Sequence, residues 1–223
     1  MKFIPLTDPL YDYIVAHGHN ADPVLAELAN ETAALGPIAR MQIAPEQGTF
    51  LSLLVRAIGA HQAIEIGTFT GYSALCIARG LPTDGRLLCC DLSEEWTAIA
   101  RRYWAKAGVD NRIDLRIGLA ADTLRALPAE PWIDFAFIDA DKVSYREYYE
   151  ALLPRLRPNA LIAFDNVLWG GQVVDATSPS EDTRALRELN DHIARDDRVE
   201  AVMLAIADGL TIARKRAPGE ARR

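Results

Sequence analysis

The hydrophobic residues of this chain follow two alternating patterns from residue 63 onward. Short apolar runs end in glycine, alanine or an acidic or amide residue, and each is followed by a longer stretch whose apolar residues recur at helical spacing. Strands that alternate with helices are typical of a parallel sheet with helices on both faces. The runs predict five strands, at residues 63–67, 86–91, 113–118, 133–140 and 160–166.

The pattern changes after the helix that follows the fifth strand. Residues 199–208 and 209–216 are two further strand-like runs, joined by Asp208-Gly209, which is a hairpin signal. They predict an antiparallel pair at one edge of the sheet. The predicted fold is therefore α/β: a doubly wound, Rossmann-like sheet of seven mostly parallel strands with an antiparallel C-terminal edge hairpin.

The residues before the first strand predict helices. Residues 4–35 carry helical spacing, and Asp22 followed by Pro23 is typical of an N-cap with a first-turn proline. Residues 41–48 predict a loop, and residues 49–58 predict the helix that leads into the first strand. We expect these segments to form an N-terminal helical cap beside the sheet.

The chain length is sufficient for one large domain with its own core. The sequence has 223 residues, and we expect a single domain over 1–223. Its parts would be the helical cap and loop (1–48), the Rossmann-like core (49–216) and a frayed tail (217–223).

The net charge and the cysteine content limit which partners and compartments we expect for this protein. The formal net charge of −7 argues against nucleic acid as the main partner, because phosphate binding needs a basic face. No apolar run approaches the roughly 20 residues of a membrane span, and the N-terminus lacks the apolar core of a secretory signal. Cys76, Cys89 and Cys90 have no metal-binding spacing and predict reduced core residues in a cytoplasmic protein.

The stretch from Ala63 to Ser73 is the first candidate binding feature. Its glycine spacing is G-x-x-x-G, at Gly67 and Gly71, whereas a dinucleotide pyrophosphate requires G-x-G-x-x-G. Glu65, inside the strand, would repel phosphate and suits a cationic or hydroxylated ligand. The alternative is a turn that only packs a helix on a strand, since short glycine motifs often match by chance.

Ligands of doubly wound sheets bind at the carboxyl ends of the strands, where the strand order reverses. Asp91 ends the second strand, roughly 20 residues beyond the glycine turn, where an acid accepts hydrogen bonds from ribose hydroxyls. The third strand ends at Gly118. Leu119 and Ala120, which follow it, leave room for a flat ring such as adenine.

Asp139, Asp165 and Asn166 follow or end the fourth and fifth predicted strands. If these strands are neighbours, about 4.8 Å apart, the three side chains converge. Two carboxylates and an amide oxygen suit Mg²⁺ or Ca²⁺, and zinc is disfavoured because no histidine or cysteine joins them. The alternative is that the acids cap helices or pair with basic residues at the rim.

Lys142 and Trp169 belong to the same strand ends. A divalent cation beside a lysine disfavours the ammonium form, so Lys142 is a candidate general base. A solvated surface lysine is the alternative. Trp169 is a candidate wall of an aromatic substrate pocket, and simple packing under a loop is its alternative. The four histidines lie away from the predicted carboxyl ends and receive no catalytic role.

These motifs together resemble the cation-dependent class I O-methyltransferases of the caffeoyl-CoA and catechol type. The resemblance is close over residues 41–174 and rests most on DADK (139–142) followed by FDNVLWGG (164–171). It implies S-adenosylmethionine as methyl donor and a divalent cation, with Mg²⁺ first and Ca²⁺ or Mn²⁺ as alternatives. The implied acceptor is a small phenolic molecule with vicinal hydroxyls, catechol-type or hydroxycinnamoyl-CoA-type, and relatives are commonly homodimers.

The resemblance also implies roles for single residues. On the donor side, Asp91 would hold the ribose hydroxyls, Ala120 would meet adenine, and Met41 opens a segment that closes over the donor. The methionine and ribose side of that pocket would be lined by Glu65, Gly67 and Ser73. The metal would be held by Asp139, Asp165 and Asn166, with Asp139 also close to the donor.

Two positions qualify this assignment. Lys142 matches a lysine proposed as the base in the family. Ile43 departs from it, because some relatives carry a hydroxyl residue there, so that contact with the donor is in doubt.

Two other functions remain open from the sequence. A nicotinamide-dependent oxidoreductase shares the sheet and the ribose-binding acid but requires the tighter glycine fingerprint. A non-catalytic nucleoside-binding module would keep the donor pocket without three metal ligands. Titration with S-adenosylmethionine and with a nicotinamide dinucleotide separates the first, and an activity assay with chelator addresses the second.

Overall fold

A seven-stranded sheet forms the centre of the computed structural model, which describes residues 4–18 and 22–220. The strand order is β3-β2-β1-β4-β5-β7-β6. β1 to β5 are parallel, and β7 runs antiparallel to both β5 and β6, which confirms the predicted fold. The strands are β1 (Gln62–Ile66), β2 (Arg86–Asp91), β3 (Ile113–Ile117), β4 (Ile133–Ile138), β5 (Leu156–Asp165), β6 (Val199–Leu204) and β7 (Leu210–Lys215).

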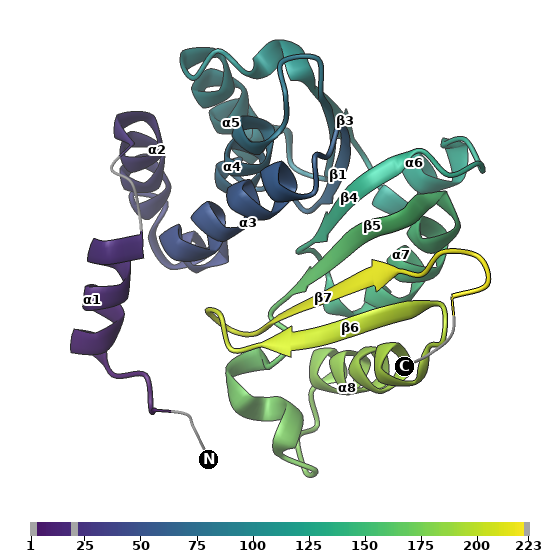
Figure 1. The fold of residues 1–223 in the computed structure, drawn as a ribbon. Helices are drawn as coiled ribbons and strands as arrows, with labels where there is room; N and C mark the ends of the chain where they lie inside the picture. The colour runs from purple at the N-terminus through teal and green to yellow at the C-terminus, as the bar shows by residue number, and fades with distance from the viewer. Residues whose placement is uncertain (1–3, 19–21, 221–223) are drawn as a thin grey trace.

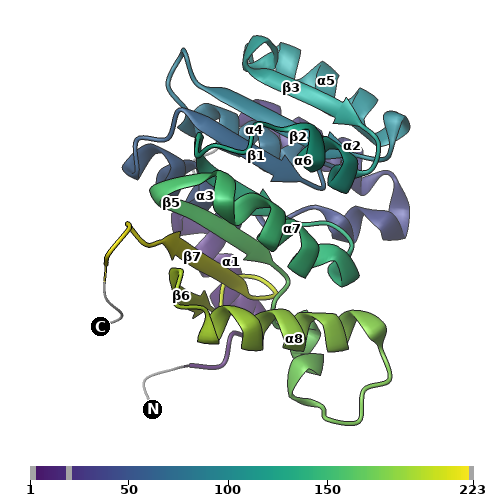
Figure 2. The same ribbon diagram turned by 90° about the vertical axis from the view of Figure 1, so that its right-hand side faces the viewer.

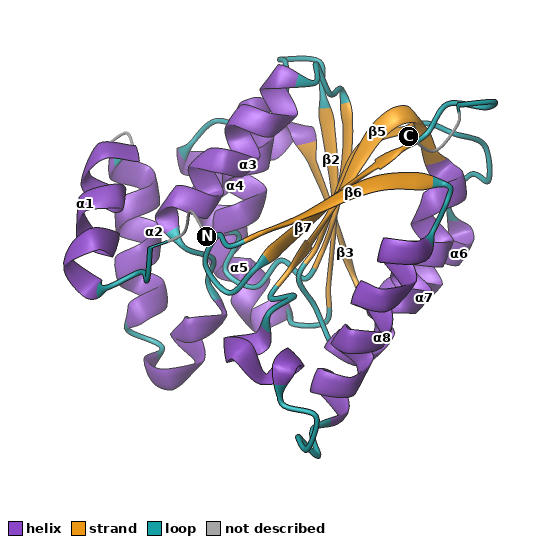
Figure 3. Cartoon of the chain, turned by 60° about the horizontal axis from the view of Figure 1, so that its bottom comes forward, coloured by secondary structure: helices purple, strands orange, loops and turns teal. Residues whose placement is uncertain are grey.

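Helices cover both faces of the sheet. Figure 3 shows the sheet edge-on, with α3, α4 and α5 on one side and α6, α7 and α8 on the other. Figure 2 shows the face that α6, α7 and α8 cover. The helices are α1 (Asp8–Gly18), α2 (Pro23–Ala33), α3 (Pro45–Ala57), α4 (Tyr72–Gly80), α5 (Glu94–Lys106), α6 (Ala120–Ala126), α7 (Tyr145–Leu152) and α8 (Glu181–Arg195).

The central strand β4 shows why its residues form a buried strand. Phe135 and Phe137 pack into the core on one face of the sheet, and Ala136 and Ile138 pack into the core on the other. Successive side chains of a strand point to opposite faces. A strand with helices on both sides is therefore apolar at nearly every position, as the sequence of β4 is.

Local capping residues set the predicted helix ends. Asp22 accepts hydrogen bonds from the backbone N–H groups of Val24 and Leu25 at 2.9 and 3.1 Å, with Pro23 in the first turn of α2. Ser93 caps α5 through its hydroxyl, which accepts from the Trp96 N–H at 3.2 Å. Both caps confirm what the sequence predicts.

The predicted loop at 41–48 is correct for residues 42–44 and wrong for residues 45–48. Residues Gly36–Met41 form a 3₁₀ turn, and α3 begins at Pro45. Gln47, Gly48 and Leu51 are buried on one side of α3, so a polar stretch that resembles a loop is in fact the first turn of a packed helix. The expected boundary between cap and core at residue 48 therefore falls inside a helix.

Leu25 and Leu28 on α2 are buried in the core of the monomer. In the tail, Glu220 accepts a hydrogen bond from Arg214 at 3.1 Å; residues 221–223 lie outside the described part. α1 has no buried residue and lies to one side of the sheet (Figure 1).

The strand order reverses between β1 and β4, because β1 leads outward to β2 and β3 while β4 leads to β5 on the opposite side. The fold thus has its ligand-binding edge at the carboxyl ends of these strands. All three cysteines are buried and unpaired, as predicted. Within residues 4–18 and 22–220, no helix has both the length and the apolar character needed to cross a membrane.

Candidate functional site

A large pocket of about 1510 Å³ lies at the carboxyl ends of the strands. Its walls come from the ends of β1, β2, β4 and β5, the segment before α3 and the turn after β5. Most residues assigned to the site from the sequence line it: Met41, Gly67, Ser73, Asp91, Ala120, Asp139, Lys142, Asp165 and Asn166. Ile43 and Trp169 line it as well, and no histidine does among the described residues.

Glu65 is the predicted site residue that does not line the pocket. Its side chain is fully buried beneath the glycine turn, where Oε2 accepts hydrogen bonds from the Thr68 hydroxyl at 3.0 Å and the Cys89 thiol at 3.6 Å. Burial raises the pKa of Glu65 to about 8, and the hydroxyls of Ser73 and Thr68 offset part of this rise. Glu65 thus supports the turn from below.

Asp91 fixes the glycine turn through backbone hydrogen bonds. Oδ2 accepts from the N–H groups of Thr68 at 2.9 Å and Phe69 at 2.7 Å, and Oδ1 accepts from the Ser93 N–H at 2.7 Å. A carboxylate has about four acceptor positions. One therefore remains for a ligand hydroxyl, so Asp91 combines a structural role with a binding capacity.

Gly67 is required where the ends of β1 and β4 meet. Its φ is +87°, and an added Cβ would lie 1.9 Å from the backbone carbonyl oxygen of Asp139. Any side chain at this position would push the two strand ends apart. The glycine turn therefore fixes the position of Asp139 and also forms the floor of the pocket.

Asp139 and Asp165 lie side by side because β4 and β5 are neighbours. Ile138 pairs with Phe164, so the residues that follow each of them meet at the edge, as the sequence predicts. Asp165 is 2% exposed. Burial raises the pKa of Asp165 to about 7, and the nearby Asp139 adds to this rise. Burial also raises the pKa of Asp139, against the opposing charge of Lys142.

Asn166 turns its amide toward the same point. Its backbone lies in the left-handed region at φ +56°, and its N–H donates to Asp165 Oδ1 at 2.8 Å. Asn is one of the few residues that tolerate this conformation. The turn therefore presents the Asn166 side-chain oxygen beside the two carboxylates.

Lys142 is a buried residue, which excludes the alternative of a solvated surface lysine. Its ammonium donates to Asp139 Oδ1 at 3.1 Å and to Asn166 Oδ1 at 2.6 Å. It also donates to the Tyr145 hydroxyl at 2.6 Å. A cation is therefore already held by two of the three predicted metal ligands.

Two residues of this site are missing from the sequence prediction. Tyr145 begins α7, three residues after Lys142, and its hydroxyl donates to the Asp165 backbone carbonyl at 3.3 Å. Gln47 on α3 is 1% exposed and lowers the pKa of Asp165. Its spacing from the buried Leu51 and Val55 is helical, and that signal was available in the sequence.

Comparison with known proteins identifies the family of the chain. The model of a family described as O-methyltransferase matches residues 15–216. The chain belongs to this O-methyltransferase family. A probable caffeoyl-CoA O-methyltransferase 1 of Dictyostelium discoideum is 39% identical over 216 residues, which are 95% of this chain and 94% of the relative. The mouse catechol O-methyltransferase domain-containing protein 1 is 37% identical over 95% of this chain and 81% of its own length.

Solved structures agree with this family and show the methyl donor. An O-methyltransferase from Bacillus cereus in complex with SAH has a TM-score of 0.84 and 36% identity, covering 92% of this chain and 96% of that chain. TomG from Streptomyces achromogenes, in complex with SAM, has a TM-score of 0.83 and 30% identity, covering 92% and 95%. This chain is an S-adenosylmethionine-dependent O-methyltransferase, which excludes the oxidoreductase and the non-catalytic module as its function.

The chemistry of the pocket of this O-methyltransferase fits a divalent cation at one end. Two carboxylates and an amide oxygen face one another there, and the Lys142 ammonium already stands among them as a cation. Hard oxygen ligands of this kind suit Mg²⁺ or Ca²⁺.

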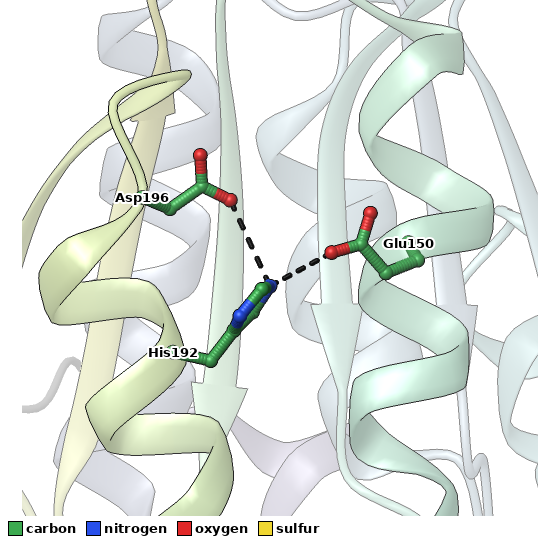
Figure 4. Close-up of side chains that lie close together, drawn as sticks. All are labelled: Glu150, His192 and Asp196. Atoms are coloured by element: carbon green, nitrogen blue, oxygen red, sulfur yellow. Dashed lines mark hydrogen bonds and ion pairs between the residues drawn. The ribbon is translucent and has the colours of Figure 1, made fainter.

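A second cluster, between α7 and α8, joins Glu150, His192 and Asp196 (Figure 4). His192 Nε2 lies 2.7 Å from Glu150 Oε1 and 3.8 Å from Asp196 Oδ2. The Arg198 guanidinium hydrogen-bonds both carboxylates, at 2.8 Å to Glu150 and 2.6 Å to Asp196. An arginine thus already neutralises these acids, and we interpret the cluster as a structural ion network.

Proposed function

We propose that this O-methyltransferase methylates one hydroxyl of a vicinal pair on a small phenolic acceptor, either catechol-type or hydroxycinnamoyl-CoA-type. The acceptor would be chelated to a divalent cation held by Asp139, Asp165 and Asn166. The observation that supports this most is a buried ammonium inside the pocket that donates to both Asp139 and Asn166, with Asp165 at the end of the neighbouring strand. Mg²⁺ is our first choice of cation, with Ca²⁺ or Mn²⁺ as alternatives.

A divalent cation at this position would supply the positive charge that makes a hydroxyl more acidic. The chain itself supplies the proton acceptor. We assign that role to Lys142, because its amine lies at the same pocket end as the three oxygen ligands. Trp169 lines the same end and would hold the flat acceptor ring.

The donor half of the pocket would be formed by the ends of β1, β2 and β3. We assign Asp91 to a ribose hydroxyl, because one acceptor position remains on its carboxylate. The other proposed donor contacts are Met41, Gly67, Ser73, Ala120 and Asp139, with Glu65 acting from beneath the turn. Holding donor and acceptor in one pocket supplies a large part of the rate, because orientation replaces a bimolecular encounter.

The names of the relatives support a phenolic acceptor. Among them are a caffeoyl-CoA O-methyltransferase of Zea mays, 39% identical over 96% of this chain, and a tricin synthase of Oryza sativa, 42% identical over 78%. These activities belong to the relatives. For this chain they define the panel of acceptors to test.

The experiment is methyl transfer from S-adenosylmethionine to a panel of matched acceptors in the presence of Mg²⁺. Catechols and dihydroxycinnamoyl-CoA esters carry vicinal hydroxyls, while the corresponding monohydroxy compounds do not. We expect transfer only to acceptors with the vicinal pair, since one hydroxyl alone cannot chelate. Equal rates with monohydroxy compounds would contradict the proposal, and the CoA ester separates the two acceptor types.

We also propose a two-fold symmetric homodimer. The support is α1, whose apolar residues Tyr13 and Ile14 remain exposed at 60% and 38%. A monomer mass by light scattering at micromolar concentration would refute the dimer. The cytoplasm remains the proposed compartment, in keeping with three unpaired, buried cysteines.

A further inference from the structure

Lys142 has the surroundings of a bound cation. Its ammonium has three N–H donors, and three oxygens accept from it, on Asp139, Asn166 and Tyr145. Two aromatic rings complete the shell, with the nitrogen 4.7 Å from the Tyr145 ring centre and 5.5 Å from that of Trp169. The chain therefore contains a complete site for a single positive charge.

Two of these three oxygens are the ones proposed to hold the divalent cation. A metal ion must lie about 2.0–2.6 Å from such an oxygen, and the ammonium nitrogen lies 2.6 Å from Asn166 Oδ1. The two cations would thus be at most about 5 Å apart while sharing the same ligands. Like charges repel at this separation in a buried site, so an ammonium in its present position opposes the binding of a divalent cation.

The ammonium also stabilises the two buried carboxylates. Asp139 and Asp165 face each other in the pocket, and the charge of Lys142 opposes the rise in the pKa of both. Buried carboxylates are costly unless a cation compensates them. Removing the ammonium would take away the basic side chain that lowers the pKa of both acids.

We propose that Lys142 acts as a built-in cation, which takes the metal position in the metal-free chain and competes with the divalent cation for it. On metal binding, its flexible four-carbon stem carries the ammonium away from Asp139 and Asn166. The inference rests on the proposed metal site. Besides proton transfer, it gives Lys142 two further effects. Lys142 stabilises the metal-free protein, and it weakens the affinity for the metal.

The test is a titration of the full chain with MgCl₂ by calorimetry at one fixed pH, together with thermal unfolding with and without Mg²⁺. Lys142→Met removes the charge and keeps an unbranched stem. The matched control is Lys106→Met, which removes a lysine that pairs with Glu27 and does not line the pocket. Lys142→Arg keeps a positive charge at the site.

We expect Lys142→Met to bind Mg²⁺ with a dissociation constant lower by about tenfold or more, because the competing charge is gone. Its metal-free melting temperature should fall, and saturating Mg²⁺ should raise that temperature more than in the wild type. Lys106→Met should match the wild type in Mg²⁺ affinity, and Lys142→Arg should not gain affinity.

An unchanged or weaker Mg²⁺ affinity in Lys142→Met would overturn the inference, and so would an equal gain in Lys142→Arg. If Lys142→Met folds only with Mg²⁺ present, the inference is supported. If it does not fold at all, Lys142→Gln provides the same comparison. Absence of Mg²⁺ binding in both wild type and Lys142→Met would instead refute the proposed metal site itself.

Discussion

Two clusters in this molecule each bring two carboxylates together with a basic side chain, and they differ in how the charges are matched. In the pocket, one ammonium faces Asp139 and Asp165, and burial raises the pKa of both acids. Between α7 and α8, the Arg198 guanidinium hydrogen-bonds Glu150 and Asp196 together. The same chemical groups thus form an under-compensated site in one place and a satisfied network in the other.

The pKa values show what the difference means. Burial alone would raise the pKa of Asp196, but hydrogen bonds from Arg198 and Tyr149 hold it down, at about 2. Arginine presents five donors in a planar fork that matches carboxylates, whereas lysine is a single point charge. The Arg198 cluster is therefore satisfied by hydrogen bonds, whereas the Lys142 cluster contains two buried carboxylates with raised pKa values that a divalent cation would stabilise.

We expect the largest effect from a substitution in the pocket cluster, and we compare it with one substitution in the Arg198 cluster. Asp165→Ala should abolish methyl transfer to a catechol, because it removes a proposed metal ligand. Its affinity for S-adenosylmethionine should persist, since Asp165 is assigned to the metal alone. The measurements are the transfer rate with Mg²⁺ and donor calorimetry.

Asp196→Ala is the matched control in the other cluster. It should keep the transfer rate and lower the free energy of unfolding by about 1–2 kcal/mol, because Tyr149 and the half-exposed Arg198 lose their partner. Equal loss of transfer in both variants would remove the distinction between the clusters.

The second prediction concerns Lys142 as a base. Lys142→Ala should slow transfer by about 10²- to 10⁴-fold, the usual range for a lost general acid or base. The defect should shrink as pH rises, because the acceptor hydroxyl then ionises unaided. The measurement is the pH profile of the transfer rate for both proteins, and a defect that stays constant with pH would assign Lys142 a positioning role only.

The expected effect at Asp91 is intermediate in size. Its carboxylate both holds the glycine turn and is proposed to bind the donor. Asp91→Ala should weaken S-adenosylmethionine binding by about 1–3 kcal/mol, the cost of unpaired polar groups. Asp91→Asn, which keeps an acceptor oxygen for the turn, should lose less. Calorimetry on folded variants decides the point, and an unchanged affinity in Asp91→Ala would rule out its role at the ribose.

The smallest expected effect is the acid sensitivity of the Arg198 cluster. The folded pKa of Asp196, about 2, lies below the usual value of about 3.9 for an unfolded aspartate. Its stabilising contribution is therefore complete above pH 4 and is lost as the pH falls toward 2. Urea unfolding of wild type and Asp196→Asn should differ above pH 4 and converge near pH 2, whereas a constant difference would contradict this linkage.

The fold was predictable because its signals are local and repeat along the chain. The apolar runs, Ser93 and Asp22 each fix an element by short-range physics. The predicted hairpin forms, but the strand expected over 199–208 ends at Leu204, so its loop spans residues 205–209 instead of Asp208-Gly209 alone. The pocket acids were predictable for a related reason, since parallel strands place their carboxyl ends at one edge. Asp139 and Asp165 follow from topology before any side-chain contact is known.

The remaining features depend on contacts between segments distant in sequence. Gln47 is polar, so its helical spacing with Leu51 and Val55 could place it on the packed face of α3 but could not show that it contributes to the site. Glu65 lies beneath the turn because strand residues alternate in direction, which places it away from the pocket although its neighbours line it. The Arg198–Glu150 pair joins residues 48 positions apart, and no local pattern indicates it.

The most direct test of the account is methyl transfer from S-adenosylmethionine to a catechol in the presence of a chelator, followed by re-addition of Mg²⁺. The under-compensated cluster at Asp139 and Asp165 predicts that chelator removes transfer, that Mg²⁺ restores it, and that donor affinity measured by calorimetry persists throughout. Full transfer in the chelator would contradict the metal mechanism and leave only the donor pocket of the account standing.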